Sequence, residues 1–434
     1  MKTEITVREN PVLGERYWQI RHKSGLNICV FPKKRSTTYA LFATKYGAAD
    51  NCFRLNETDE FTSVPDGIAH FLEHKMFENE DGSDAFEQFA ALGANANAYT
   101  SALTTAYLFS CTENWEKSLA VLLDMVTHPH FTEESVEKEK GIISEEIRMG
   151  EDSPSRALYY GMIRSLYQEN HLRINVAGTV KSISGIDPAL LYRCHEVFYN
   201  LRNMGLFLCG DITVEQVLAV ADAHLETAPP LSIQCRENPE PDAVASPRYR
   251  QKMQVAKPLF AIGVKDTNIP ADPGERMRRQ AVLDILNEIL FSKSSPWRNT
   301  LYEEGLIGAS LSYGYGICDR YAYNSFSGES KDPEEVYRRY VEYLCEMREN
   351  GIDPDAFERC RRVIYADCIS TYDDTTEIAH ALLDAVFDEE ELFDEPACIA
   401  SVTLADVEKA LREQFDETKT VMAVIEPLDE EETV

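Results

Sequence analysis

An internal repeat restricts the possible folds of this chain more than any other feature. The segment Ala281–Phe291 (AVLDILNEILF) can be laid on Gly67–Phe77 (GIAHFLEHKMF) without a gap, and the apolar positions coincide. Farther along, Phe131–Ile147 lies over Ile352–Cys368, again without a gap. Self-similarity of this kind indicates two copies of one structural unit. We therefore expect two similar α+β domains of about 200 residues each, which is a usual domain size.

A proline-rich segment marks the boundary between the two copies. Residues 228–247 hold five prolines and few apolar residues, which is typical of a linker. The predicted domains are therefore residues 1–227 and 248–434. Within the first domain, residues 94–112 predict the two strands of a hairpin and Trp115–Thr127 predicts an amphipathic helix.

Charge and cysteine content exclude several classes of protein. The net charge of −31 argues against nucleic acid and anionic membranes as partners, because both need a basic protein face. The 11 cysteines form no C-x-x-C pair, which is typical of a reducing compartment. The first residues lack the apolar core of a signal peptide, and no run of about 18 apolar residues is present. We expect a soluble cytoplasmic protein.

The segment Gly67–Phe77 carries the pattern H-x-x-E-H. His70 and His74 are four residues apart, so on a helix their imidazoles lie one turn apart on one face and can bind one metal ion. Glu73 stands beside them, where it can take a proton from a metal-bound water. The alternative is a charged helix face with two solvated histidines, and by chance the pattern occurs in roughly one chain in a hundred of this size.

The second copy of the repeat argues for the metal interpretation. Its helix keeps the apolar pattern but replaces the polar residues of the motif. The positions of His70, Glu73 and His74 become Asp284, Asn287 and Glu288. The histidines are therefore not needed to build the fold, which favours a functional role for them.

A third ligand should come from a different element, because catalytic zinc sites usually have three protein ligands and one open position. The predicted helix 136–148 offers Glu139 and Glu146, which are two turns apart on the face of Ile143, whereas Glu145 points about 100° away from Glu146. We expect Glu146 to bind the metal and Glu139 to orient a histidine or the water. The alternative is a solvated acidic helix.

Several stretches of the chain make it similar to a known family. These are GIAHFLEH, GANANAYTS with TAYLFS, EKEKGIISEEIRMGEDSP, AGTVKSI and FYNLRNMGLFLCGD. The chain resembles the pitrilysin-type inverzincin metallopeptidases, the family of insulin-degrading enzyme and mitochondrial processing peptidase, and in particular its short bacterial members. The resemblance covers nearly the whole chain, and it argues against a chance motif on an unrelated α/β binding protein.

The resemblance implies a complete metallopeptidase site. It implies one Zn²⁺ per chain bound by His70, His74 and Glu146, with Glu73 as the general base and Glu139 seven residues before the ligand. It implies two homologous α+β domains, each an antiparallel-rich sheet packed with helices. It also implies that the strand after the motif is an edge to which a peptide substrate adds as a further strand. That strand holds Asn97, Ala98 and Tyr99.

One departure from the family pattern bears on activity. Active members present an arginine and a tyrosine from a domain without zinc, and these residues hold the scissile carbonyl. In the matching stretch, LYEEGLIG, Tyr302 stands where the arginine is expected and Gly308 where the tyrosine is expected. We expect a homodimer, or a heterodimer with a paralogous chain that supplies the pair, closed around a chamber. The alternative is a non-catalytic scaffold subunit, although such subunits usually lose their metal ligands.

Overall fold

The chain forms two compact units in the computed structural model, which describes residues 2–80 and 82–429. Unit one comprises Met1–Ile147, Ile174–Glu237 and Ser370–Phe393. Unit two comprises Arg148–Arg173, Asn238–Ile369 and Asp394–Val434. Both units combine antiparallel-rich sheets with packed helices, which confirms the predicted α+β class.

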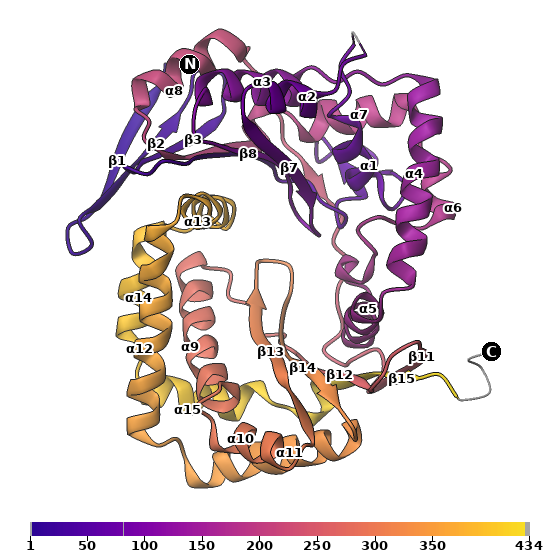
Figure 1. Cartoon of the computed structure of the whole chain (residues 1–434), viewed down its shortest axis with the longest axis vertical. Coiled ribbons are helices and arrows are strands. Elements are labelled where there is room, and N and C mark those ends of the chain that lie inside the picture. Colours follow the sequence, from indigo (N-terminus) through magenta and orange to yellow (C-terminus); the bar gives the residue numbers. More distant parts are fainter. Residues whose placement is uncertain (1, 81, 430–434) are drawn as a thin grey trace. The chain divides into compact units, whose positions relative to one another are not determined.

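The main sheet of unit one has the strand order β1-β2-β3-β9-β4-β8-β7 (Figure 1). These strands are β1 (Glu4–Asn10), β2 (Glu15–Arg21), β3 (Asn27–Pro32), β9 (Met204–Gly210), β4 (Thr38–Thr44), β8 (Thr105–Cys111) and β7 (Ala94–Thr100). β3 and β9 pair in parallel, and the other neighbours pair antiparallel. β4 and β9 are buried at every residue, as central strands covered on both faces must be. β7 closes the order and is an edge strand of the described sheet.

Helices cover both faces of this sheet. The helices of unit one are α1 (Ile68–Lys75), α2 (Ala85–Ala91), α3 (Trp115–Thr127), most of α4 (Glu133–Glu151), α6 (Val180–Ile183), α7 (Pro188–Phe198), α8 (Val214–His224) and α13 (Thr375–Phe387). α1, α2 and α3 pack on the side of β7 and β8, whereas α13 crosses the opposite face over β4 and β9 (Figure 1). A smaller sheet of β10 (Gln234–Cys235), β5 (Cys52–Arg54) and β6 (Thr62–Ser63) completes the unit.

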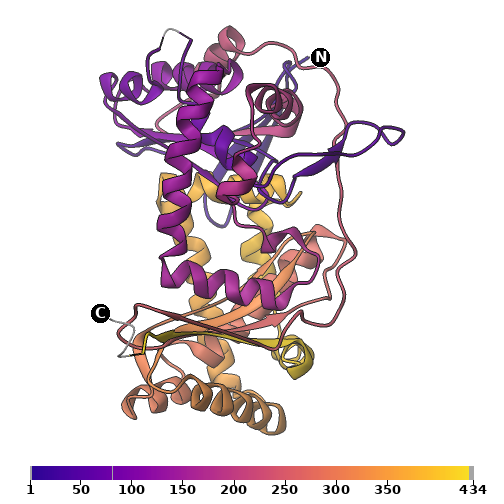
Figure 2. The same cartoon turned by 90° about the vertical axis from the view of Figure 1, so that its right-hand side faces the viewer.

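The sheet of unit two has the order β11-β15-β12-β14-β13. Its strands are β11 (Arg248–Met253), β15 (Thr420–Pro427), β12 (Leu259–Lys265), β14 (Ala322–Ser330) and β13 (Ile307–Ile317). Its helices are α5 (Pro154–Leu166), α9 (Pro273–Phe291), α10 (Pro296–Glu303), α11 (Pro333–Asn350), α12 (Pro354–Ser370), α14 (Glu395–Ser401) and α15 (Leu404–Gln414). Figure 2 shows α5 against one face of this sheet and α11 beyond the other.

The compact units differ from the continuous ranges 1–227 and 248–434 in two places. Residues 148–173 belong to unit two, where α5 packs on β12 and β15. Residues 370–393 belong to unit one, where α13 packs on β4 and β9. The N-terminal half of the sequence thus supplies α5 to the sheet of unit two. The C-terminal half supplies α13 to the sheet of unit one. Amphipathic spacing shows that a helix has a buried face, but it does not show which sheet that face covers.

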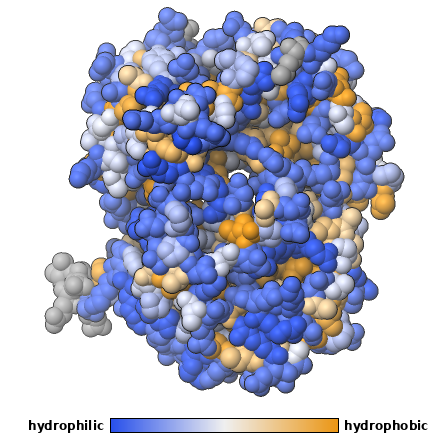
Figure 3. Space-filling model, turned by 180° about the vertical axis from the view of Figure 1, so that it is seen from behind, coloured by the Kyte–Doolittle hydropathy of each residue, from blue (hydrophilic) through white to orange (hydrophobic). Residues whose placement is uncertain are grey.

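The face of the molecule in Figure 3 is mostly polar. Hydrophilic residues cover most of the face in Figure 3, and hydrophobic residues form small, separate patches there. This agrees with a chain that carries 74 acidic and 43 basic residues. Among the residues that the structure describes, no helix is long and apolar enough to cross a membrane.

Candidate metal centre

The helix α1 is held at its first residue by a neighbouring loop. Gly67 caps the helix with a φ of 92°, and a Cβ at this position would lie 2.5 Å from the carbonyl oxygen of Ala177. Gly178 has a φ of 71°, and a Cβ there would lie 2.4 Å from the carbonyl oxygen of Asp66. Ser182 Oγ donates to the same oxygen at 2.8 Å. Two glycines therefore allow a contact between backbones that fixes where α1 begins.

The predicted histidine pair lies on one face of α1. The ring centroids of His70 and His74 are 4.6 Å apart. The other faces of the helix are anchored by buried side chains, including Ile68, Phe71 and Leu72. Burial of these apolar residues orients the helix, so both imidazoles point toward α4.

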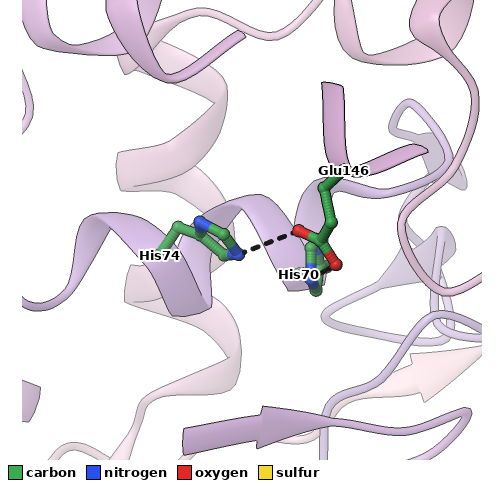
Figure 4. Close-up of side chains that lie close together, drawn as sticks. All are labelled: His70, His74 and Glu146. Atoms are coloured by element: carbon green, nitrogen blue, oxygen red, sulfur yellow. Dashed lines mark ion pairs between the residues drawn. The ribbon is translucent and has the colours of Figure 1, made fainter. Parts of the chain in front are cut away.

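The helix α4 brings a carboxylate to the two imidazoles. Glu146 Oε1 lies 3.6 Å from His70 Nε2, and Glu146 Oε2 lies 3.5 Å from His74 Nε2 (Figure 4). One potential ligand atom from each of the three residues lies within 4.8 Å of the others. The structure thus places together the residues that the sequence indicated as a ligand set.

The donor set fits Zn²⁺. Zinc binds imidazole nitrogen and carboxylate oxygen at about 2.0–2.2 Å, so the ligand atoms of a tetrahedral site are about 3.3–3.5 Å apart. The nitrogen–oxygen distances of 3.6 and 3.5 Å each involve a different oxygen of Glu146, so both carboxylate oxygens face the imidazoles. A His₂Glu set also leaves one tetrahedral position open for water or substrate, as catalytic sites require.

Glu139 is hydrogen-bonded to His74 on the side of the ring away from the site. Its Oε1 lies 3.0 Å from His74 Nδ1, and the residue is only 7% exposed. With the Nδ1 proton donated to Glu139, the lone pair of Nε2 is directed toward Glu146 and the site. Burial lowers the pKa of His74, but the hydrogen bonds to Glu139 and Glu146 outweigh burial and raise the pKa to about 9. Without a metal, His74 is therefore a cation between two carboxylates.

Glu73 is held by a residue that sequence analysis did not identify. Thr100 Oγ1, at the end of β7, donates to Glu73 Oε2 at 2.6 Å. Burial raises the pKa of Glu73, while the Thr100 bond and the charge of His74 oppose that rise without cancelling it. A carboxylate with a raised pKa is a better proton acceptor at neutral pH than an exposed one. Helical or strand periodicity could not have predicted this contact, because Thr100 and Glu73 are 27 positions apart. The only signal in the sequence is that Thr100 lies within the family marker GANANAYTS.

The predicted substrate strand lies at an edge of the described sheet, as part of β7. Ser101 N–H donates to Thr104 C=O at 2.7 Å, and Ala98 is opposite Tyr107. Bonded and non-bonded pairs alternate along antiparallel strands, so the N–H and C=O of Ala98 point away from β8. The Ala98 N–H is bonded to the Asn97 side-chain oxygen at 2.9 Å. The outward groups of Ala98 are thus available to a strand that displaces this local bond.

The corresponding positions of unit two are closed by hydrogen bonds within the protein. Tyr313 OH donates to Glu288 at 2.8 Å, Asn324 to Asn287 at 2.9 Å, and Gln280 to Asp284 at 2.8 Å. Burial raises the pKa of Asp284 to about 7. The metal chemistry of the repeat is therefore confined to unit one, within the part of the chain that the structure describes.

The two positions that depart from the expected arginine and tyrosine lie in unit two. Tyr302 is in α10 and its residue is 54% exposed. Gly308 is the second residue of β13, and the atom nearest to a Cβ there would be the Cβ of Glu329, at 3.6 Å. Neither position carries a cation or a hydroxyl group fixed by neighbouring side chains.

Comparison with known families gives two matches along the chain. The family described as "Insulinase (Peptidase family M16)" matches residues 56–180, which include the whole metal centre. The family described as "Peptidase M16 inactive domain" matches residues 185–364. The first match therefore covers the residues of the metal centre. The second match covers the second copy of the repeat helix, which lacks the two histidines.

Individual relatives agree with this assignment. A protein of Bacillus subtilis (strain 168) named "Uncharacterized zinc protease YmfH" is 36% identical over 419 residues, which are 96% of this chain and 97% of that protein. The crystal structure of an M16-like peptidase of Alicyclobacillus acidocaldarius has a TM-score of 0.90 and 31% identity, and it covers 99% of both chains. Pitrilysin shares the fold, with a TM-score of 0.74 at 14% identity over 98% of this chain and 46% of its own.

Proposed function

The chain belongs to the insulinase family of peptidases, M16, and on that premise we propose that it is a zinc-dependent endopeptidase acting on peptides and unfolded segments. The observation that carries the proposal is the convergence of His70, His74 and Glu146 from two helices, with one potential ligand atom of each within 4.8 Å of the others. The names of relatives support zinc as the metal. We assign one Zn²⁺ to each chain.

The residues of the site have distinct roles in peptide hydrolysis. Zinc, when bound, supplies a Lewis acid that lowers the pKa of a water molecule to about 7 and polarises a carbonyl. Glu73 accepts a proton from the attacking water and delivers it to the amine that leaves. Thr100 holds the Glu73 carboxylate, and Glu139 keeps Nε2 of His74 available as a ligand. The six side chains of the site and its support come from three elements: His70, Glu73 and His74 from α1, Glu139 and Glu146 from α4, and Thr100 from β7.

The edge strand β7 is the proposed binding site for the peptide backbone. A peptide that adds beside Asn97, Ala98 and Tyr99 bonds to the outward N–H and C=O of Ala98 and lies next to α1. Recognition through backbone groups tolerates many sequences, and it requires an extended chain. We propose that two family chains enclose this edge in a chamber, which admits peptides and unfolded segments.

Metal content tests the site directly. The purified, dialysed chain should contain about one zinc, and Glu146→Gln should lose it or bind it much more weakly, because an amide is a poorer zinc ligand than a carboxylate. Glu145→Gln is the matched control, since Glu145 is the exposed neighbour on the same helix. Glu73→Gln should keep the zinc and lower turnover about 10²- to 10⁴-fold, the usual contribution of a general base. Equal zinc in wild type and Glu146→Gln would contradict the ligand assignment.

We further propose that a second family chain supplies the carbonyl-binding arginine and tyrosine. Tyr302 and Gly308 at the expected positions support this proposal. The pure chain should hydrolyse peptides weakly, and addition of a paralogous chain that carries the pair should restore activity. Strong, chelator-sensitive hydrolysis by the pure chain would contradict the need for such a partner.

The competing function is a scaffold subunit without activity. The scaffold function is supported by Tyr302 and Gly308 at the expected arginine and tyrosine positions. It is also supported by the family description of residues 185–364 as an inactive domain. The complete set of His70, Glu73, His74 and Glu146 argues against it. A folded chain that binds no zinc would favour the scaffold.

A further inference from the structure

The imidazole of His380, on α13, joins two tyrosines from different strands of the unit-one sheet. Its Nε2 lies 3.1 Å from the hydroxyl of Tyr39 on β4, and its Nδ1 lies 3.4 Å from the hydroxyl of Tyr99 on β7. The His380 ring also contacts both phenol rings, at centroid distances of 5.8 and 5.9 Å. A neutral imidazole has one donor and one acceptor nitrogen, so it can serve both hydroxyls at once.

Tyr99 is the residue through which this contact reaches the edge strand. Along β7, Ala96 and Ala98 pack with the core on the side of α1, whereas Tyr99 packs on the opposite face with the residues around α13. The neighbouring residues on that face, Asn95 and Asn97, are exposed. Among the described side chains of β7, Tyr99 therefore provides the packing that holds the strand from this face.

The position of Tyr99 determines the orientation of the groups proposed to bind a peptide. Tyr99 lies between Ala98, whose N–H and C=O point outward, and Thr100, whose hydroxyl holds Glu73. A rotation of the Tyr99 backbone would turn the peptide planes on both sides of it. An edge strand has a neighbour on one side only, so side-chain contacts must supply the remaining restraint.

We propose that His380 is a positioning residue for substrate binding, which acts through Tyr99 on the edge of β7. This inference rests on the proposed peptidase function. His380 bonds to Tyr39 and Tyr99, whereas Thr100, which holds Glu73, also contacts Thr105 of β8 at 3.4 Å. Loss of His380 should therefore weaken peptide binding more than it slows the chemical step.

The test uses His380→Ala, His380→Gln and Tyr99→Phe in the full, zinc-loaded chain. The control is His128→Ala, because His128 is an exposed histidine that directly follows α3. Loss of one hydrogen bond changes an equilibrium by about 3- to 10-fold. For a fluorogenic peptide, His380→Ala should raise KM by that factor and lower kcat by a smaller factor. His380→Gln, which retains a donor and an acceptor, should recover the wild-type KM.

Hydrogen exchange gives a readout that does not need activity. In His380→Ala and Tyr99→Phe, the amides of residues 94–100 should exchange about 3- to 10-fold faster, whereas the rest of unit one keeps its rates. The double variant should exchange no faster than His380→Ala alone, because His380→Ala already removes the hydrogen bond that Tyr99→Phe removes. If His380→Ala fails to fold, Tyr99→Phe carries the same test.

Two results would overturn the inference. One is unchanged exchange at residues 94–100 in both variants, and the other is faster exchange spread evenly over unit one, which would mean a purely structural role. A wild-type chain that binds zinc but cleaves no peptide would count against the proposed function of the lone chain. The exchange data would still decide the role of His380.

Discussion

At the scale of single residues, the metal centre depends on the groups behind the ligands. His74 bonds to Glu139, and Glu73 bonds to Thr100. Both supporting residues are placed by elements other than α1. A ligand or base that is fixed by a second hydrogen bond spends more time in the productive geometry. The supporting residues should therefore affect metal affinity and catalysis without touching the substrate.

Glu139→Gln should weaken zinc binding about 10- to 100-fold, the usual effect of losing the carboxylate behind a metal-binding histidine. The physical reason is that a neutral amide holds the Nδ1 proton of His74 less strongly and makes Nε2 a poorer ligand. Competition against a chelator of known affinity measures the change. Glu145→Gln, on the exposed side of the same helix, should leave the affinity within about twofold of wild type.

Zinc binding should release protons, because the pKa of His74 is raised to about 9 in the metal-free chain. At pH 7 the imidazole is protonated and must lose that proton to bind the metal. Affinity should rise about tenfold for each pH unit up to about pH 9 and then level off. Calorimetric titration in two buffers of different ionisation enthalpy should count about one proton released from His74 at pH 7.

The same shift fixes the sign of the stability change in the metal-free chain. The pKa of His74 is higher in the folded chain than its ordinary value of 6.5. Its stabilising effect is therefore complete below about pH 6.5, and it is lost as the pH rises through about 9. Zinc release without any proton uptake at pH 7 would contradict this account.

At the scale of elements, the position of α1 is the central feature. The helix begins where the loop of Ala177 and Gly178 meets Asp66 and Gly67. Apolar burial orients the helix about its axis, and the glycine contact fixes its start. The equivalent helix α9 of unit two begins at Pro273 and is longer. The gap-free alignment of the repeat therefore holds for the shared turns of the two helices and not for their beginnings.

Gly178→Ala should destabilise unit one and reduce zinc affinity. The new Cβ would lie 2.4 Å from the Asp66 carbonyl oxygen, at a φ of 71° that L-residues rarely adopt. Strain at such a position costs about 1–3 kcal/mol, and relief of the clash requires α1 to move. Urea denaturation and chelator competition measure the two effects.

Gly141→Ala is the matched control for this prediction. Gly141 lies in the middle of α4, and a Cβ there meets nothing within 4 Å. The same substitution should therefore raise the free energy of unfolding by about 0.5–1 kcal/mol. Equal effects of the two substitutions would show that the loop does not constrain α1.

At the scale of the whole molecule, the chain is more interwoven than a linear order of two domains. α5 and α13 each belong to the compact unit that the other half of the sequence builds. The linker is also less free than its prolines indicate. Residues Gln234–Cys235 pair with β5 in unit one, and Glu240 is held within unit two. The linker is thus anchored to unit one through residues 234–235 and to unit two through Glu240.

Glu240→Ala should lower the free energy of unfolding of unit two by about 1–3 kcal/mol, the cost of taking one partner from a buried donor, because Lys265 keeps its bonds to the carbonyl oxygens of Pro241 and Ala243. Glu240 pairs with Lys265, which is 1% exposed, and accepts the backbone N–H groups of residues 168–170. Burial raises the pKa of Glu240, but these bonds outweigh it and lower the pKa. The stabilisation is therefore present near neutral pH and is lost in acid.

Denaturation and limited proteolysis of the linker measure this effect. The Glu240→Ala chain should be cleaved faster between residues 228 and 247 than the wild type. Asp242→Ala, at an exposed position two residues away, should change stability by no more than about 0.5 kcal/mol. Unchanged proteolysis in Glu240→Ala would show that the anchor does not restrain the linker.

Local spacing in the sequence was sufficient to predict the α+β class, the repeat, and the candidate ligands. Four residues separate His70 from His74, and two turns separate Glu139 from Glu146, so helical periodicity alone places each pair on one face. Only the tertiary structure placed Thr100 beside Glu73 and His380 beside Tyr99, across 27 and 281 positions of sequence. Those contacts depend on strand order and on how helices dock, as does the membership of α5 in unit two and of α13 in unit one. Local periodicity in the sequence encodes neither.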